Sequence, residues 1–209
     1  MRHRDTHSRE EILERTIQII EHHGEAAVRV KDLCDEVGVA VTSLYHFFDN
    51  REGLIEAAQV ERYERELRRA ADDITDHISA CRTQREFRSL VRRLLDMLCA
   101  HERAGARLNR INVIGSVQGR PDLERRIGAA QTAFHHDLAA ALELPQQRGW
   151  IRRDLDLAAL TAWFFGQITS RILIEIGDSD IDGRAWNRMA TEAITAVMFG
   201  EVRSIRSAA

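Results

Sequence analysis

Residues 30–54, VKDLCDEVGVAVTSLYHFFDNREGL, are the most informative part of this 209-residue chain. Their apolar residues predict two short helices on either side of Gly38, whose freedom to take a left-handed conformation permits a sharp turn. A third, longer helix is predicted to start near Arg51. Two short helices joined by a glycine turn are typical of the helix-turn-helix, in which the second helix enters the major groove of DNA.

The rest of the sequence favours an all-α fold of about nine helices. Ala, Leu, Arg and Glu fill the long stretches, and only two prolines occur. We expect no apolar run to approach the ~18 residues of a membrane span, and residues 1–9 are polar, without a signal-peptide core. The sequence therefore predicts a soluble, cytoplasmic protein with no membrane partner.

Capping and helix-breaking residues predict where the helices begin and end. Ser8 and Glu11 form the pattern of a capping box at the start of the first helix, and Gly24 ends that helix. Residues 49–52 are predicted to form a second capping box. Beyond them, helices are predicted at about 51–80, 84–103, 106–117, 121–143, 155–177 and 183–203.

The two short helices each have an apolar face that would pack inward. The residues predicted to face inward are Val30, Leu33, Cys34 and Val37 on the first of them, and Leu44 and Phe48 on the second. The opposite face of the second helix carries small and hydrogen-bonding side chains, which suit contact with base edges and phosphates. The predicted DNA-binding residues are Arg29, Lys31, Val41, Thr42, Ser43, Tyr45, His46 and Arg51.

The net charge of the N-terminal region does not favour DNA binding. Residues 1–60 carry 7 Arg and Lys against 12 Asp and Glu, a net charge of −5. Nucleic-acid-binding domains are usually basic. The acidic residues concentrate in the first two predicted helices, whereas residues 39–48 contain none. We therefore expect modest non-specific affinity that depends strongly on salt.

The sequence resembles the TetR family of bacterial transcriptional regulators. The resemblance is carried by GVA at 38–40, SLYHFF at 43–48 and REGL at 51–54, and more weakly by RGWIRRDLD at 148–156. It implies a helix-turn-helix DNA-binding domain at 1–52 and a helical effector-binding and dimerisation domain at 53–209. It also implies binding to double-stranded operator DNA and control by a small molecule.

The last two predicted helices are apolar around much of their circumference. They either close the chain's own core or pair with a second copy in a four-helix bundle. We favour the homodimer because its two-fold symmetry would place one DNA-binding domain on each of two half-sites. The predicted interface residues are Leu160, Ile168, Ile172, Trp186, Met189, Ala190, Ala193, Ile194 and Val197.

A cavity for an apolar or amphipathic effector is expected among the middle helices. Apolar walls and a few polar groups from these helices would enclose it. The candidate residues are Met97, Asn109, Asn112, Phe134, His135, Trp163, Phe164 and Gln167.

Other kinds of site fit the sequence poorly. Residues 178–183, DSDIDG, begin like a calcium-binding loop, but the twelfth position is Met189 in place of glutamate. Asp73, His77 and Cys81 share a helix face without a supporting metal motif. No catalytic motif occurs, so no enzyme activity, metal or cofactor is expected, and three cysteines without a CxxC pair predict buried thiols.

These observations favour a dimeric regulator, most often a repressor in the TetR family, that a small molecule releases from a palindromic operator. Two alternatives use the same residues. The chain can be a helical interaction or ligand-sequestering protein whose helix-turn-helix no longer reads DNA, or it can be a transcriptional activator.

Overall fold

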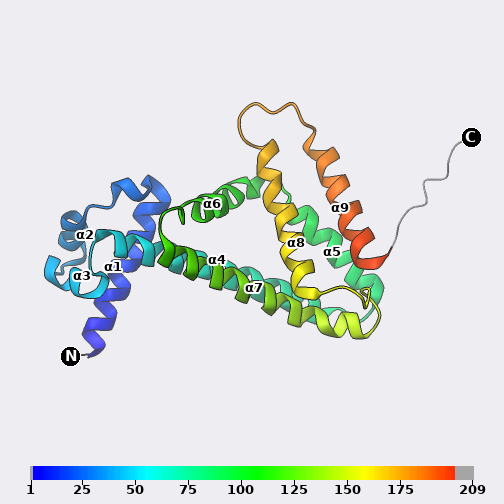
Figure 1. Ribbon diagram of the computed structural model, residues 1–209, viewed down its shortest axis with the longest axis horizontal. Helices are drawn as coiled ribbons and strands as arrows, with labels where there is room; N and C mark the ends of the chain where they lie inside the picture. Colours follow the sequence, from blue (N-terminus) through cyan, green and yellow to red (C-terminus); the bar gives the residue numbers. More distant parts are fainter. Residues whose placement is uncertain (1, 201–209) are drawn as a thin grey trace, which may run out of the picture. The chain divides into compact units, whose positions relative to one another are not determined.

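A computed structural model describes the backbone of residues 2–200, with side chains from Ser8 onward (Figure 1). Over these residues the protein is all-α, with nine α-helices, three short 3-10 helices and no strand, which confirms the predicted fold class. The α-helices are α1 (Arg2–His23), α2 (Val30–Val37), α3 (Val41–Phe48), α4 (Arg51–Ala80), α5 (Gln84–Leu98), α6 (Ala104–Gly115), α7 (Pro121–Gln147), α8 (Leu157–Ser170) and α9 (Gly183–Phe199). The 3-10 helices are η1 (Glu25–Ala27), η2 (His101–Arg103) and η3 (Arg171–Ile174).

The chain divides into two compact units. The first comprises residues 2–66 together with Val117–Ile127, and the second comprises Leu67–Ser116 together with 128–200. Each unit therefore contains part of α4 and part of α7. The predicted boundary between functional domains, after residue 52, stays a prediction; α4 begins just before it and runs through it.

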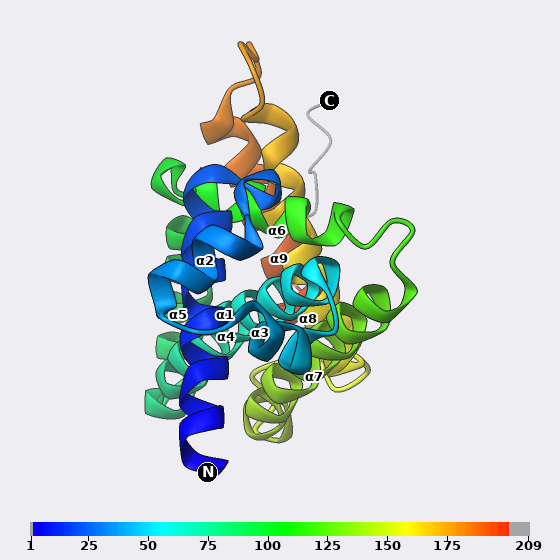
Figure 2. The same ribbon diagram turned by 90° about the vertical axis from the view of Figure 1, so that its left-hand side faces the viewer.

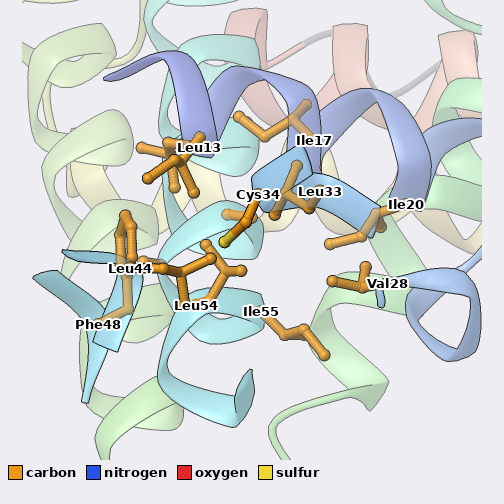
Figure 3. Packing of buried hydrophobic residues seen from close by; sticks show 13 residues of the cluster. Leu13, Ile17, Ile20, Val28, Leu33, Cys34, Leu44, Phe48, Leu54 and Ile55 are labelled. Carbon is orange, nitrogen blue, oxygen red and sulfur yellow. The ribbon is translucent and has the colours of Figure 1, made fainter. Parts of the chain in front are cut away.

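The first unit packs α1, α2, α3 and the start of α4 around one apolar core. Figure 2 shows α1, α2 and α3 together. Side chains from all four helices point toward one another in Figure 3. Leu33, Cys34, Leu44 and Phe48 are buried as predicted. Val30 and Val37, also predicted to face inward on α2, are half-buried and pack against the same core. The labelled members of the core are Leu13, Ile17, Ile20, Val28, Leu33, Cys34, Leu44, Phe48, Leu54 and Ile55.

Both N-terminal capping boxes were predicted wrongly. Ser8 lies inside α1, which begins at Arg2, because no glycine or proline in the preceding residues interrupts the helix. At the start of α4, Asn50 acts alone: its Oδ1 accepts a hydrogen bond of 2.8 Å from the amide of Gly53. The complete capping box lies at α5, where Thr83 and Glu86 cap each other's backbone amides.

Two helices of the second unit end earlier than predicted because buried arginines intervene. Helix α5 ends at Leu98 instead of 103, and Arg107 donates to the free carbonyls of Leu98 (2.5 Å) and Ala100 (3.0 Å). Helix α8 ends at Ser170 instead of 177, and the chain tightens into η3, which begins with the buried Arg171.

The remaining differences are at the ends of α6, α7 and α9. Helix α6 covers 104–115 instead of 106–117. Helix α7 runs past Pro145 to Gln147, since a proline so near the end removes only one hydrogen bond of the last turns. Helix α9 ends at Phe199, where Gly200 takes a left-handed conformation (φ 73°) that terminates it.

One segment, Leu157–Ile174, is long and apolar enough to span a membrane by length and composition, contrary to our expectation. It includes the buried Arg171, and its residues Leu160, Phe165 and Ile168 pack into the second unit. Helices of soluble cores pass the same test, so this segment does not indicate a membrane protein.

Candidate nucleic-acid interface

The turn between α2 and α3 has the predicted geometry. Gly38 adopts a left-handed conformation (φ 75°, ψ 33°), which a residue with a side chain rarely takes. Its amide and that of Val39 both donate to the carbonyl of Cys34, at 2.9 and 3.0 Å. The two hydrogen bonds close the end of α2 and direct the chain into α3.

Helix α3 presents a buried face and an exposed face. Leu44 and Phe48 are 0% and 5% exposed, whereas Val41 and Tyr45 on the other side are 37% and 42% exposed. Thr42 and His46 are exposed as well, and Ser43 is half-buried. The residues predicted to read DNA from α3 therefore lie together on one accessible surface. We call Val41, Thr42, Tyr45 and His46 the reading face.

Arg29 and Lys31 lie at the start of α2, where Arg29 is exposed and is the N-cap residue. Lys31 is exposed too, and no described side chain caps the amides of the first turn of α2. Free amides and adjacent cations at a helix N-terminus attract phosphate groups. The position of the two residues suits the predicted phosphate contacts.

Arg51 has a different environment from the one predicted. Its Nε donates to the carbonyl of Val28 (2.8 Å) and its Nη2 to the carbonyl of Glu25 (2.7 Å). The guanidinium thus ties the start of α4 to the segment before α2, inside the first unit. The sequence did not indicate these two carbonyl partners, and the predicted phosphate contact of Arg51 stays a prediction.

The junction between α3 and α4 is tightly built. Asp49 ends α3 with a positive φ of 58°. A Cβ on Gly53 would lie 2.3 Å from the carbonyl oxygen of Phe48, so no larger residue fits there without a backbone shift. The guanidinium of Arg9 on α1 lies 5.2 Å from the centre of the Phe48 ring, a cation–π contact that holds the end of α3.

A polar cluster that sequence reasoning missed joins Val117–Ile127 to the rest of the first unit. Arg120 forms ion pairs with Glu25 (3.2 Å) and Glu52 (2.6 Å), and Gln59 donates to Glu25 (2.8 Å). Burial acts to raise the Glu25 pKa, but the hydrogen bonds from Arg120 and Gln59 outweigh it and hold the pKa below its ordinary value. These partners are far apart in sequence, and no local pattern signals them.

The second unit contains an apolar cavity of about 50 Å³. Its wall comes from α4, α5, α7, α8 and α9. The signal that sequence reasoning missed was the i, i+3, i+4, i+7 spacing of four apolar residues on α5. The lining residues are Ile74, Ile78, Phe87, Leu90, Val91, Leu94, Leu138, Leu142, Leu160, Thr161, Phe164, Phe165 and Met198.

The predicted effector residues are spread over several environments. Phe164 lines the cavity, and Phe134 is buried against Phe165, with ring centroids 4.8 Å apart. His135 and Gln167 are half-buried. The others are exposed: Met97, Asn109, Asn112 and Trp163.

The predicted interface residues divide between the core and the surface of the second unit. Met189 is 72% exposed, Ala193 is exposed, and Trp186 and Val197 are half-buried. The remaining five are buried within the unit itself: Leu160, Ile168, Ile172, Ala190 and Ile194. Further exposed apolar residues lie nearby in sequence, from η3 through the loop at the top of Figure 1: Leu173, Ile176 and Ile181.

The described residues hold no group of three or more side chains arranged as a metal site. Asp73 and His77 interact through the Asp73 carbonyl instead of forming a ligand set. Cys34, Cys81 and Cys99 are free and buried, as predicted, and burial raises the pKa of each thiol.

Comparisons with known proteins agree with this geometry. Residues 12–58 match the family model of bacterial regulatory proteins, tetR family. No curated protein matches the chain. A Mesorhizobium loti protein assigned to the TetR-family transcriptional regulators has a similar structure, with a TM-score of 0.68, 17% identity, and coverage of 93% of this chain and 98% of the other.

Two similar structures contain small molecules. The transcriptional regulator FadR from Bacillus subtilis, in complex with stearoyl-CoA, has a TM-score of 0.56 at 17% identity over 90% of this chain and 98% of its own. A Saccharomonospora viridis protein assigned as a transcriptional regulator, in complex with choline, has a TM-score of 0.63 at 17% identity, over 92% and 98%. At this level of identity the likeness concerns the fold.

Proposed function

We propose that this chain, whose residues 12–58 match the tetR family model and whose fold is similar to that of a TetR-family regulator, is a ligand-responsive repressor. In this proposal two copies bind a palindromic operator, each placing its reading face in a major groove. The observation that carries it is the division of α3 into a buried face and an exposed face of small and hydrogen-bonding residues. Such a face has no role in packing the first unit.

The proposed DNA contacts follow from the placement of the residues. Val41, Thr42 and Ser43 would contact base edges at the start of α3, and Tyr45 and His46 would donate to phosphates. Arg29 and Lys31 would neutralise phosphates beside the start of α2. Arg51, with two backbone carbonyls as partners, would support α4 instead.

Homodimerisation is proposed through the exposed apolar surface that runs from α8 to α9. Trp163, Leu173, Ile176 and Met189 are all exposed, between 37% and 73%. Large apolar side chains left exposed on neighbouring elements are candidates for burial in an interface. A two-fold dimer would place the two reading faces on half-sites ~34 Å apart.

The proposed effector occupies the second unit, which contains the apolar cavity. Two proteins of similar fold are in complex with small molecules, which supports a ligand-responsive function. It would shift the equilibrium between two arrangements of the dimer, one of which no longer fits both half-sites. A coupling of ~1–3 kcal/mol would lower operator affinity about 5- to 150-fold. Such a regulator would act in the cytoplasm and carry no catalytic activity.

The test is fluorescence anisotropy of the full-length protein on the intergenic DNA beside its own gene, with unrelated DNA of equal length as competitor. We expect specific binding at ~150 mM salt with two chains, or a multiple of two, per site. Tyr45→Phe and Lys31→Ala should each weaken it. Arg69→Ala removes an exposed cation of α4 and is the matched control, because it changes net charge without changing the reading face.

The alternative of an interaction or ligand-sequestering protein is favoured by one observation, the net charge of −5 over residues 1–60. It predicts that Tyr45→Phe, Lys31→Ala and Arg69→Ala bind DNA equally weakly. Binding to the intergenic DNA that is no tighter than binding to the competitor at every salt concentration would favour this alternative. An activator would bind DNA like the repressor and would raise transcription from the bound promoter in a reporter assay.

A further inference from the structure

Helices α6, α7 and α8 bring a cation, an imidazole and two aromatic rings together in the second unit. The guanidinium carbon of Arg110 on α6 lies 5.6 Å from the ring centres of both Phe134 and Phe165. Its Nη2 donates to Oε1 of Gln131 at 3.0 Å. These contacts fix the position of the charged group between α7 and α8.

His135 completes this cluster from α7. Its ring centre lies 5.2 Å from that of Phe134 and 6.2 Å from that of Phe165. The Nδ1 atom is buried and has no hydrogen-bond partner among the described residues. A buried polar atom without a partner costs free energy, about 1–3 kcal/mol in typical cases, which a bound hydrogen-bonding group would recover.

The electrostatic environment at His135 is positive. Burial lowers the pKa of His135, and the charges of Arg110 and His136 lower it further. This shift favours the neutral imidazole, which can carry a proton on Nδ1 for donation. A negatively charged group would be stabilised here, whereas a cation would be repelled.

The apolar cavity adjoins this positive site. Phe165 and Thr161 line the cavity, while Phe165 also contacts Arg110 and the Thr161 hydroxyl donates to the carbonyl of His135 at 3.1 Å. One water-sized group needs about 10–15 Å³ on the same measure. The cavity of about 50 Å³ therefore accommodates roughly three to five such groups, the size of a short alkyl chain.

We propose that the second unit binds an amphipathic carboxylate, with its short apolar tail in the cavity and its carboxylate on Arg110 and His135. A guanidinium attracts a carboxylate by charge and by charge-assisted hydrogen bonding, and Nδ1–H of the imidazole supplies a further donor. The inference rests on the proposed ligand-responsive function and names the chemical class of its effector. Because Arg110 lies on α6, the carboxylate would act directly on the helix that leads toward Arg120.

The test is calorimetric titration of the full-length protein, without DNA, with three six-carbon probes: hexanoate, 1-hexanol and hexylamine. The tails are matched, so the differences report on the head group. We expect hexanoate to bind at least tenfold more tightly than 1-hexanol, and hexylamine to bind most weakly. Equal affinity of hexanoate and 1-hexanol, or no binding of hexanoate, would overturn the proposal.

Variants locate the two halves of the site. Arg110→Met keeps the length of the side chain and should bring hexanoate affinity down to that of 1-hexanol, whereas Arg92→Met, an exposed arginine of α5, should change nothing. His135→Phe keeps a ring against Phe134 and Phe165 and should weaken hexanoate at least threefold. Leu138→Phe fills the cavity and should weaken hexanoate and 1-hexanol alike.

Circular dichroism and thermal melting of each variant show whether it is folded, and His135→Phe provides a second measurement of the head-group site if Arg110→Met does not fold. Unchanged hexanoate affinity in folded Arg110→Met and His135→Phe would refute the assignment. Because the titration contains no DNA, a chain that binds its operator but not hexanoate contradicts this inference alone. A chain that binds hexanoate but no DNA contradicts only the proposed repressor function.

Discussion

Nη2 of Arg120 lies 2.6 Å from Oε1 of Glu52, and this ion pair joins the residue before α7 to the first turn of α4. The same nitrogen lies 3.2 Å from Glu25, just after α1. One side chain thus connects three segments of the first unit.

Replacement of Arg120 should loosen the first unit. Arg120→Ala removes the partner of two carboxylates, and because all three side chains are partly exposed we expect a loss of about 1 kcal/mol in the free energy of unfolding. The control is Arg125→Ala, whose ion pair with Asp122 is largely exposed and should leave stability unchanged. Urea denaturation measures both; equal effects of the two variants would contradict the role given to Arg120.

The buried ion-pair cluster of the second unit should be far more sensitive. Glu175, 6% exposed, pairs with Arg107 (2.5 Å) and with Arg171, which also donates to Asn187 at 2.8 Å. Glu175→Ala leaves two buried cations without their carboxylate, and we expect a loss of about 3–5 kcal/mol in the free energy of unfolding.

The control for Glu175→Ala is Asp154→Ala, which removes an exposed partner of Arg152 and should have little effect. Thermal melting and urea denaturation measure the difference between the two variants. A Glu175→Ala protein as stable as Asp154→Ala would show that the cluster contributes nothing to folding.

Two glycines should respond to alanine with opposite signs. Gly53→Ala places a Cβ against the Phe48 carbonyl and should destabilise the protein by about 1–3 kcal/mol. At Gly128, inside α7, an added Cβ would meet no neighbouring atom within 4 Å, so Gly128→Ala should stabilise the protein by about 0.5–1 kcal/mol through helix propensity. Melting temperatures of the two single variants decide the matter; a shift in the same direction would contradict this account.

The stability of the protein should fall as the pH falls through the range where histidine is protonated. The pKa of His135 is lower in the folded protein than its ordinary value of 6.5, so the unfolded chain binds more protons at intermediate pH. The free energy of unfolding therefore decreases as the pH falls below about 6.5 and levels off below the folded pKa.

Urea denaturation between pH 8 and pH 5 measures this dependence. The contribution from His135 should disappear in His135→Phe, whereas His101→Asn, at an exposed histidine of η2, should retain it. An identical pH dependence in wild type and His135→Phe would show that this imidazole is not the group responsible.

The features that the sequence predicted correctly depend on local signals. Gly24 and Gly38 end their helices with positive φ because few other residues tolerate that conformation. Leu44 and Phe48 face inward because their spacing matches a helical turn. The helix-turn-helix and the accessible face of α3 follow from these residues alone.

The features that it missed depend on partners distant in the chain. Arg51 donates to the carbonyls of Val28 and Glu25, more than 20 positions earlier in the sequence, and no local pattern indicates these contacts. Arg107 ends α5 early and pairs with Glu175, 68 positions later in sequence. Spacing rules describe one helix at a time, so they cannot locate a cavity whose walls come from five helices or an ion pair between separate elements.

The separation of the reading face from the core of the first unit has an evolutionary consequence. Val41, Thr42, Tyr45 and His46 make no contribution to the buried cluster, which is held by Leu44, Phe48 and the other helices. Mutation at those four surface positions would leave the buried cluster intact. Under the proposed function, the preferred operator could therefore change after gene duplication without an unfolded ancestor.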